Sequence, residues 1–160
     1  MKRTLLALTA AVGLILGLPG SASAHSTDDW ALSGQFPGER GYGYAGDSQS
    51  HVSGVFQGVA MWRLGNKVSL STYASDTKTD GYCAGLQIRY EIYDGGQWAG
   101  HWHYRDVPVF DCTTGGAETG GVIKEYFYSK YPVRNVSSRA CHADSSGGII
   151  HCESNWHGPI

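Results

Sequence analysis

Four of the seven histidines occur in two pairs, and imidazole is the side chain that most readily moves protons or binds metals near neutral pH. His101 and His103 are two residues apart, so their side chains would share one face of a strand. His142 and His151 flank a glycine-containing turn and are expected to lie opposite each other. A zinc site needs at least three protein ligands, and the sequence identifies no third ligand for either pair. We therefore expect no metal site and no cofactor, with the histidines exposed on a polar strand face.

Acid–base hydrolysis is the other chemistry that these residue types allow. Small secreted nucleases use a glutamate, an arginine and a histidine on a sheet, and Glu91 and Arg89 precede His101 and His103 in the same stretch. Such a mechanism needs all of these groups within hydrogen-bond reach of one substrate proton. A cross-strand ion pair explains Arg89 and Glu91 equally well. The chain has no serine elbow, phosphate-binding loop, HExxH motif or calcium loop, and we expect that it is not an enzyme.

The elements that position these residues form a hairpin over residues 83–112. Leu86, Ile88, Tyr90 and Ile92 alternate with polar residues, and this period of two is typical of a half-buried strand. Glycines 95 and 96 supply the positive φ values of a tight turn. Beyond the turn, aromatic and polar residues alternate again: Trp98, Trp102 and Tyr104 with His101, His103 and Arg105. We expect Gln87, Arg89 and Glu91 on the face of the histidines, and the aromatic side chains on the core face.

Residues 1–24 have the features of a secretory signal peptide. Lys2 and Arg3 precede an apolar run, and Ala22-Ser23-Ala24 ends it with small residues, so we expect cleavage after Ala24 and secretion. The apolar run is short for a membrane span, and no second run follows. The net charge of −2 gives no electrostatic case for binding to nucleic acid or to an anionic membrane.

All four cysteines lie beyond the signal peptide, and an even number of cysteines in an exported chain indicates two disulfides. Three connectivities are possible. Cys83 and Cys112 flank the first hairpin, and Cys141 and Cys152 face each other if a second hairpin turns near residues 146–147. We therefore predict the pairs Cys83–Cys112 and Cys141–Cys152, each contributing roughly 3 kcal/mol on the loop-entropy model. A four-cysteine zinc site is disfavoured because no C-x-x-C pair is present.

Residues 25–50 differ in composition from the rest of the chain, because they are rich in glycine and poor in core-forming residues. One interpretation is a disordered terminus. The other is an extended arm that adds as a strand to a sheet edge, either its own or that of a partner. Trp30, Leu32 and Phe36 fall on one parity of such a strand, so we predict that they bind a partner. The glycine-rich residues 41–46 would serve as a flexible tether.

Residues 51–160 are predicted to form one all-β domain. Short apolar runs separated by turn signals are typical of an antiparallel β-sandwich or of a small closed barrel. The sandwich is favoured because each hairpin has one apolar and one polar face. Aromatic residues are numerous enough that some are expected on the surface, as a platform for sugar or protein: Trp98, Trp102, Tyr104, Tyr126, Phe127, Tyr128 and Tyr131.

The chain also resembles a known group of proteins. The segment from Asp76 to Cys83, the strand ending Ile88-Arg89-Tyr90, and the hairpin from Arg139-Ala140-Cys141 to Cys152 are similar to small secreted β-sandwich proteins of actinobacteria. Within that group the chain resembles the adaptor subunit of umbrella toxin particles over residues 68–152 and in having an extended N-terminal arm. This resemblance implies an extracellular antibacterial assembly, in which the adaptor joins a large toxin-bearing subunit to a lectin subunit and has no catalytic residues.

We therefore expect a secreted, non-catalytic protein–protein interaction module, stapled by two disulfides and acting as an adaptor in a toxin complex. The other function classes that fit the sequence are a carbohydrate-binding module, a secreted inhibitor of hydrolases, and a small secreted hydrolase.

Overall fold

A computed structural model describes residues 25–112 and 125–160, so the predicted signal peptide lies outside the described part. The described residues form ten strands and one 3-10 helix. In chain order these elements are β1 (Trp30–Ser33), η1 (Pro37–Arg40), β2 (Gly43–Val52), β3 (Val55–Leu64), β4 (Lys67–Asp76), β5 (Cys83–Asp94), β6 (Gln97–Trp98), β7 (His103–Asp111), β8 (Tyr126–Ser129), β9 (Val133–Ala143) and β10 (Ile149–Cys152). None of them is a helix with the length and apolarity needed to span a membrane.

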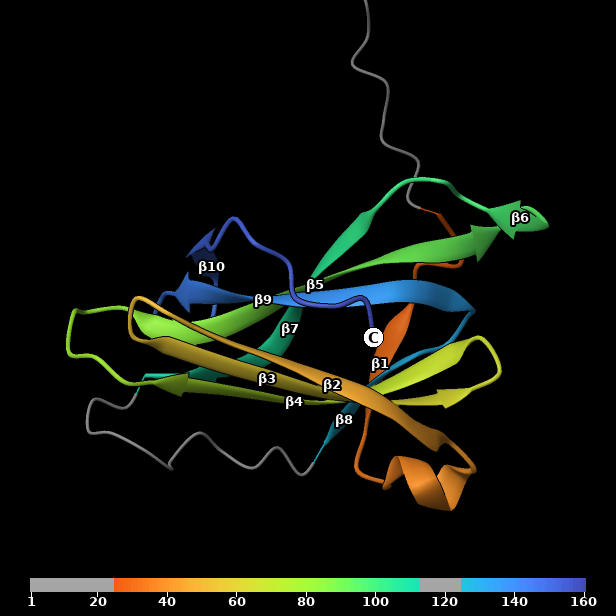
Figure 1. The fold of residues 1–160 in the computed structure, drawn as a ribbon, viewed down its shortest axis with the longest axis horizontal. Coiled ribbons are helices and arrows are strands. Elements are labelled where there is room, and N and C mark those ends of the chain that lie inside the picture. The colour runs from red at the N-terminus through yellow and green to blue at the C-terminus, as the bar shows by residue number, and fades with distance from the viewer. Residues whose placement is uncertain (1–24, 113–124) are drawn as a thin grey trace, which may run out of the picture.

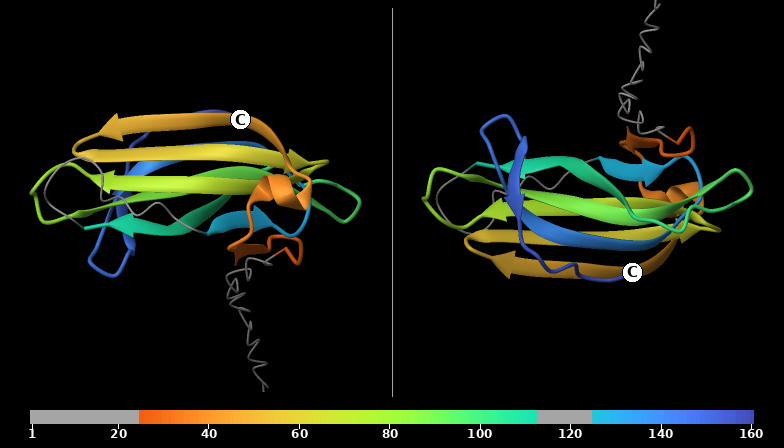
Figure 2. Two further views of the ribbon diagram at one scale, coloured as in Figure 1. Left: turned by 90° about the horizontal axis from the view of Figure 1, so that it is seen from below. Right: turned by 90° about the horizontal axis from the view of Figure 1, so that it is seen from above.

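The strands form two antiparallel sheets that pack face to face, which confirms the predicted β-sandwich (Figures 1 and 2). Sheet A has the order β1-β8-β4-β3-β2. Sheet B has the order β10-β9-β5, with β7 on the other edge of β5 and the short β6 paired to its end. Because β2, β3 and β4 are consecutive hairpins while β8 returns beside β4, segments far apart in sequence share one sheet.

The inner faces of the two sheets supply one apolar core. Strand β5 contributes the four alternating residues expected from the sequence, and all of them are fully buried: Leu86, Ile88, Tyr90 and Ile92. Opposite them lie Val59, Met61 and Leu70 of sheet A, which are also buried. Burying each such side chain contributes about 1.5–3 kcal/mol before ordering costs, so this interior is what holds the two sheets together.

Both predicted disulfides are confirmed. Cys83 is bonded to Cys112 and Cys141 to Cys152, and each bond joins the feet of its own hairpin. The register of the second hairpin is also as expected, since Cys141 pairs with Cys152 and His142 with His151. The described residues contain no free cysteine.

The expected faces of the first hairpin are wrong for its second strand. Tyr90 stands opposite His103, and Arg89 stands opposite Tyr104. Cross-strand partners share a face, so Tyr104 points outward with Arg89, and His103 lies on the side of Tyr90. The reason is the turn at glycines 95 and 96, which places odd-numbered residues opposite even-numbered ones.

The expected division into an arm over residues 25–50 and a domain over residues 51–160 is also wrong. Strand β1 pairs with β8, and β2 pairs with β3 over its whole length, so residues 41–46 are not a free tether. Trp30 is buried, with its ring stacked on Phe127 at 4.9 Å and tilted against Tyr90 at 5.0 Å. A tryptophan offers a large apolar area, and this strand gains most by burying it in its own sandwich.

The C-terminal residues close the side of the sandwich between β2 and β9. Glu153 is central there, because its carboxylate accepts hydrogen bonds from the backbone N–H of Ala140 at 2.7 Å and from the Ser50 hydroxyl at 2.5 Å. His157 lies 3.0 Å from the same carboxylate and pairs through its backbone with Ser138. Burial opposes ionisation of Glu153, but these hydrogen bonds outweigh it and hold the pKa of Glu153 below its usual value of 4.5.

We predict that Trp30→Ala lowers the free energy of unfolding by about 3–5 kcal/mol, because it removes a buried aromatic side chain. Leu32 is 47% exposed, and Leu32→Ala should cost less than about 1 kcal/mol. Urea denaturation of both variants measures the difference. Equal, small effects would mean that β1 does not belong to the folded core.

We also predict that Glu153→Gln lowers the free energy of unfolding by about 1.5–3 kcal/mol at neutral pH, the value of hydrogen bonds to a charged group. A carboxyl whose pKa is lowered by folding stabilises the protein above its unfolded pKa and loses this contribution as the pH falls toward its folded pKa. The difference between wild type and variant should therefore be full above about pH 5 and shrink below pH 4.5. Thermal melts from pH 3 to pH 7 measure it, and a difference that does not change with pH would contradict this role.

Candidate functional site

The outer face of sheet B carries a stack of alternating arginine and aromatic side chains, which we call the arginine–tryptophan ladder: Trp102, Arg89, Trp156, Arg139 and Tyr104. The Arg89 guanidinium lies between the two indoles, 4.4 Å from the centre of Trp102 and 4.8 Å from that of Trp156. Arg139 covers Trp156 at 4.3 Å, and Tyr104 lies against the same indole at 5.6 Å. Cation–π contacts hold this set in a fixed arrangement at the surface.

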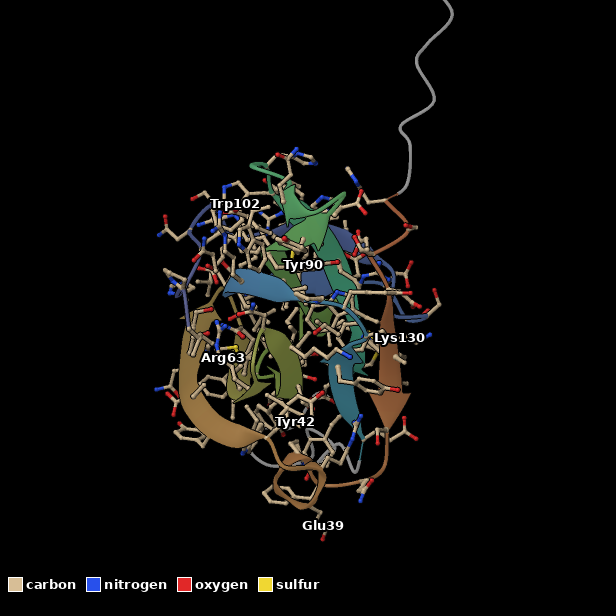
Figure 3. All side chains as sticks on the ribbon, turned by 90° about the vertical axis from the view of Figure 1, so that its right-hand side faces the viewer. Glu39, Tyr42, Arg63, Tyr90, Trp102 and Lys130 are labelled. Carbon is tan, nitrogen blue, oxygen red and sulfur yellow. A yellow bond between two sulfur atoms is a disulfide. The ribbon has the colours of Figure 1, made fainter. Side chains whose placement is uncertain are left out.

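Three strands and two irregular segments build the ladder. Arg89 and Arg139 come from adjacent strands β5 and β9, Tyr104 from β7, and Trp102 and Trp156 from the irregular segments before β7 and after β10. Arg139 is fixed further, because it donates to Gln87 Oε1 at 2.6 Å and to the carbonyl of Glu153 at 3.2 Å. Trp102 lies at the surface, whereas Tyr90 lies inside the sandwich (Figure 3).

A second contact of the same kind lies at the end of β5. Arg134 covers the Trp98 ring at 4.4 Å and forms an ion pair with Glu91 at 2.7 Å. The hydrogen bond from Arg134, helped by one from Asn135, lowers the pKa of Glu91. Glu91 is therefore an ionised partner of Arg134, and no ion pair joins it to Arg89 among the described residues.

The ladder presents positive charge that is not neutralised locally. Arg89 forms no ion pair with any described residue, and Arg139 contacts only neutral oxygens. Trp102 and Tyr104 remain 37% and 55% exposed. Tryptophan, tyrosine and arginine are the residues that dominate binding energy at protein interfaces, so this face has the composition of an interaction surface.

The outer face of sheet A carries a separate aromatic cluster: Phe36, Tyr44, Trp62 and Tyr126. The rings of Phe36, Tyr44 and Tyr126 all meet Trp62 edge to face, with centroids about 6 Å from it (5.8, 5.9 and 6.1 Å). Tyr44 and Phe36 are 61% and 44% exposed. A shallow groove on the same sheet is lined by residues of β2, β3 and β4, among them Asp47, Gln49, Phe56 and Tyr73.

The first histidine pair has a neighbour that sequence reasoning missed. The N-terminal segment brings His25 to His101 and His103, with ring centroids 5.4 and 5.2 Å away. One nitrogen from each of the three rings lies within 4.8 Å of the others. His25 is therefore a potential third metal ligand for this pair, and the expectation that none is present is wrong.

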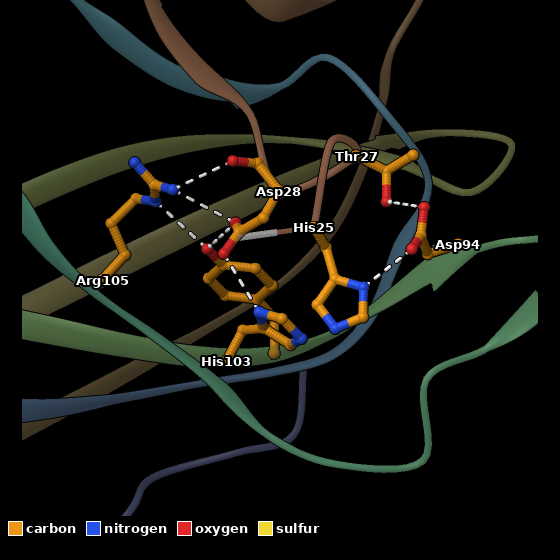
Figure 4. Close-up of polar contacts among 7 residues, drawn as sticks. His25, Thr27, Asp28, Asp94, His103 and Arg105 are labelled. Carbon is orange, nitrogen blue, oxygen red and sulfur yellow. Dashed lines mark hydrogen bonds and ion pairs between the residues drawn. The ribbon is translucent and has the colours of Figure 1, made fainter. Parts of the chain in front are cut away.

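Behind His103 lies a partly buried polar network around Asp28 (Figure 4). The Asp28 carboxylate accepts hydrogen bonds from the Tyr90 hydroxyl at 2.5 Å, from His103 Nδ1 at 3.0 Å and from Arg105 at 3.2 Å. Burial works against ionisation of Asp28, but these bonds outweigh it and lower its pKa. Burial raises the pKa of Tyr90, and its bond to Asp28 adds to the effect.

The second histidine pair is structural. His142 Nδ1 and His151 Nε2 are 2.7 Å apart, and His142 Nε2 donates to the Ser53 carbonyl at 3.2 Å. Both ring nitrogens of His142 are therefore occupied, and this pair joins β10 to the turn between β2 and β3. Among the described residues it has no third metal-binding group.

The three residues predicted to bind a partner are not brought together. Trp30 is buried in the core of its own sandwich. Leu32 is exposed at the edge strand β1, and Phe36 belongs to the aromatic cluster of sheet A. The ladder residue Trp156 was missed because it lies in a tail without strand periodicity, and His25 because it is remote in sequence from His101.

Comparison with known proteins adds no assignment: no family model, no curated protein and no solved structure matches the chain. The resemblance to the toxin adaptor therefore stays a prediction.

Proposed function

We propose that this protein is a secreted, non-catalytic adaptor that binds one protein partner on each outer face of its sandwich. The observation that carries the proposal is the presence of two exposed aromatic surfaces on opposite faces: the arginine–tryptophan ladder on sheet B and the aromatic cluster on sheet A. An adaptor needs two surfaces that do not compete, and the thickness of the sandwich separates these two.

A protein partner with carboxylates on its surface suits the ladder. Its guanidinium groups lack acidic partners within the described chain, and arginine pairs with carboxylates in a planar, two-point geometry. Stacking between indoles holds Arg89 in place, so little side-chain entropy is lost on binding. The cluster on sheet A is uncharged and suits an apolar surface of a second partner.

Secretion and membership of a toxin complex belong to the same proposal. Two disulfides are compatible with an extracellular protein. The signal-peptide pattern of residues 1–24 supports export. The resemblance to umbrella toxin adaptors supports a toxin-bearing subunit and a lectin subunit as the two partners.

We predict that Trp102→Ala and Phe36→Ala remove different partners. Proteins captured by the immobilised wild type from the medium of the producing culture are identified by mass spectrometry, and each is purified and titrated against the variants. Loss of a central aromatic residue costs about 2 kcal/mol or more, roughly a thirtyfold loss of affinity. Each variant should lose one partner by this amount and retain the other.

Each variant is the control for the other, because both side chains are exposed and neither change should affect folding. If every captured protein binds both variants as tightly as wild type, the adaptor proposal fails. Binding of soluble glycans to the purified protein, lost on changing Tyr73 in the groove of sheet A, would instead support the carbohydrate-binding class.

A further inference from the structure

We infer that His25, His101 and His103 form a binding site for a divalent transition-metal ion of the zinc or copper type. The site lies where the N-terminal segment meets the start of β7, and Figure 4 shows two of its residues, His25 and His103. It is separate from the aromatic cluster on sheet A and from the contacts that form the ladder.

The hydrogen bonds of the three rings leave one nitrogen of each free for a metal ion. In each ring Nδ1 already has an acceptor: Asp94 Oδ2 at 2.7 Å for His25, the Ala99 carbonyl at 3.0 Å for His101, and Asp28 Oδ2 at 3.0 Å for His103. A carboxylate or a carbonyl can only accept, so Nδ1 carries the proton in all three rings. The lone pair of a neutral ring is then on Nε2, which is the atom left for a metal.

The three Nδ1 hydrogen bonds are also typical of the histidine ligands in metal sites. A metal-binding histidine almost always donates its second ring N–H to a carboxylate, a backbone carbonyl or water, because this fixes the orientation of the ring and raises its basicity. Here two of the three rings have a carboxylate behind them and the third has a carbonyl. Histidines that are close together by chance need not each have an oxygen acceptor for the N–H of Nδ1.

The Nε2 atom of His103 also points to a metal ion at this site. This atom is buried and has no hydrogen-bond partner within the described residues. Buried polar atoms are normally satisfied, since an unsatisfied one costs about 1–3 kcal/mol. A metal ion held with His25 and His101 would occupy that atom.

The geometry needs only a modest adjustment. Around a tetrahedral zinc ion, ligand nitrogens are about 3.3 Å apart, given bond lengths near 2.0–2.1 Å. One ring nitrogen from each histidine lies within 4.8 Å of the others. His101 is exposed and follows Gly100, whose φ of 71° marks a turn, so this ring has room to approach the other two.

Charge and ligand type define the class of ion. Asp94 faces His25 without a lysine or arginine partner among the described residues, so negative charge remains close to the site. Three imidazoles without a thiolate suit Zn²⁺ and Cu²⁺ better than Ca²⁺ or Mg²⁺, which prefer oxygen ligands. Three protein ligands leave a fourth position to water or to a group from another molecule.

The test is a titration of untagged, secreted protein, stripped of metal with a chelator and checked by mass spectrometry to begin at His25. Isothermal titration calorimetry with Zn²⁺ alone should give one equivalent with a dissociation constant in the micromolar range or tighter. The thermal midpoint should rise with Zn²⁺ concentration, because the ion binds only the folded state. Removal of a ligand in His101→Ala should abolish this binding.

Two further variants distinguish a specific zinc site from non-specific binding of zinc to surface histidines. Asp94→Asn keeps all three rings but weakens the acceptor behind His25, and should reduce affinity about 10–100-fold. His51→Ala removes an exposed histidine on β2 and should change nothing. The inference is overturned if wild type binds no Zn²⁺, if His101→Ala binds it as wild type does, or if His51→Ala loses it to the same extent.

Discussion

The hydrogen bonds of the Asp28 carboxylate fix the position of the N-terminal segment, and the placement of β1 and of His25 depends on them. The carboxylate joins this segment to β5 through Tyr90 and to β7 through His103 and Arg105. This carboxylate is partly buried, and its oxygens are paired when the segment lies in this position, which stabilises its charge. That position places Trp30 two residues later against Tyr90 and Phe127, and so starts β1 at the edge of sheet A. It also brings His25 to the histidines of the first hairpin.

The alternation of side chains across each strand explains why one small domain has two different surfaces. Strand β5 sends Leu86, Ile88 and Tyr90 into the core and Gln87 and Arg89 outward. Strand β3 does the same with Val59 and Met61 inside and Trp62 on the outer face. Packing of the inward-facing residues therefore also fixes the outward-facing residues between them. Arg89 of the ladder is held in place by core residues with which the ladder makes no contact.

Much of the fold could be predicted from the sequence, because its signals are local. The period of two identified the buried side of β5, and the spacing of cysteines around turns identified both disulfides. The faces of the first hairpin were assigned wrongly although the turn was located correctly, since a change of one residue in pairing exchanges the two faces. The candidate sites were harder to predict: Trp156 and His25 take part only because the chain folds back, and no local pattern indicates which strand a tail will cross.

The placement of the five tryptophans has a spectroscopic consequence. Trp30 is buried against two aromatic rings, whereas Trp102 is exposed and the other three indoles (Trp62, Trp98 and Trp156) are half-buried. Emission from Trp30 reports on the integrity of the interior, and emission from the other four indoles reports on contacts at the surface. A soluble quencher that reaches only exposed indoles would divide the fluorescence into these two parts, so that unfolding and ligand occupancy are followed separately in one unlabelled sample.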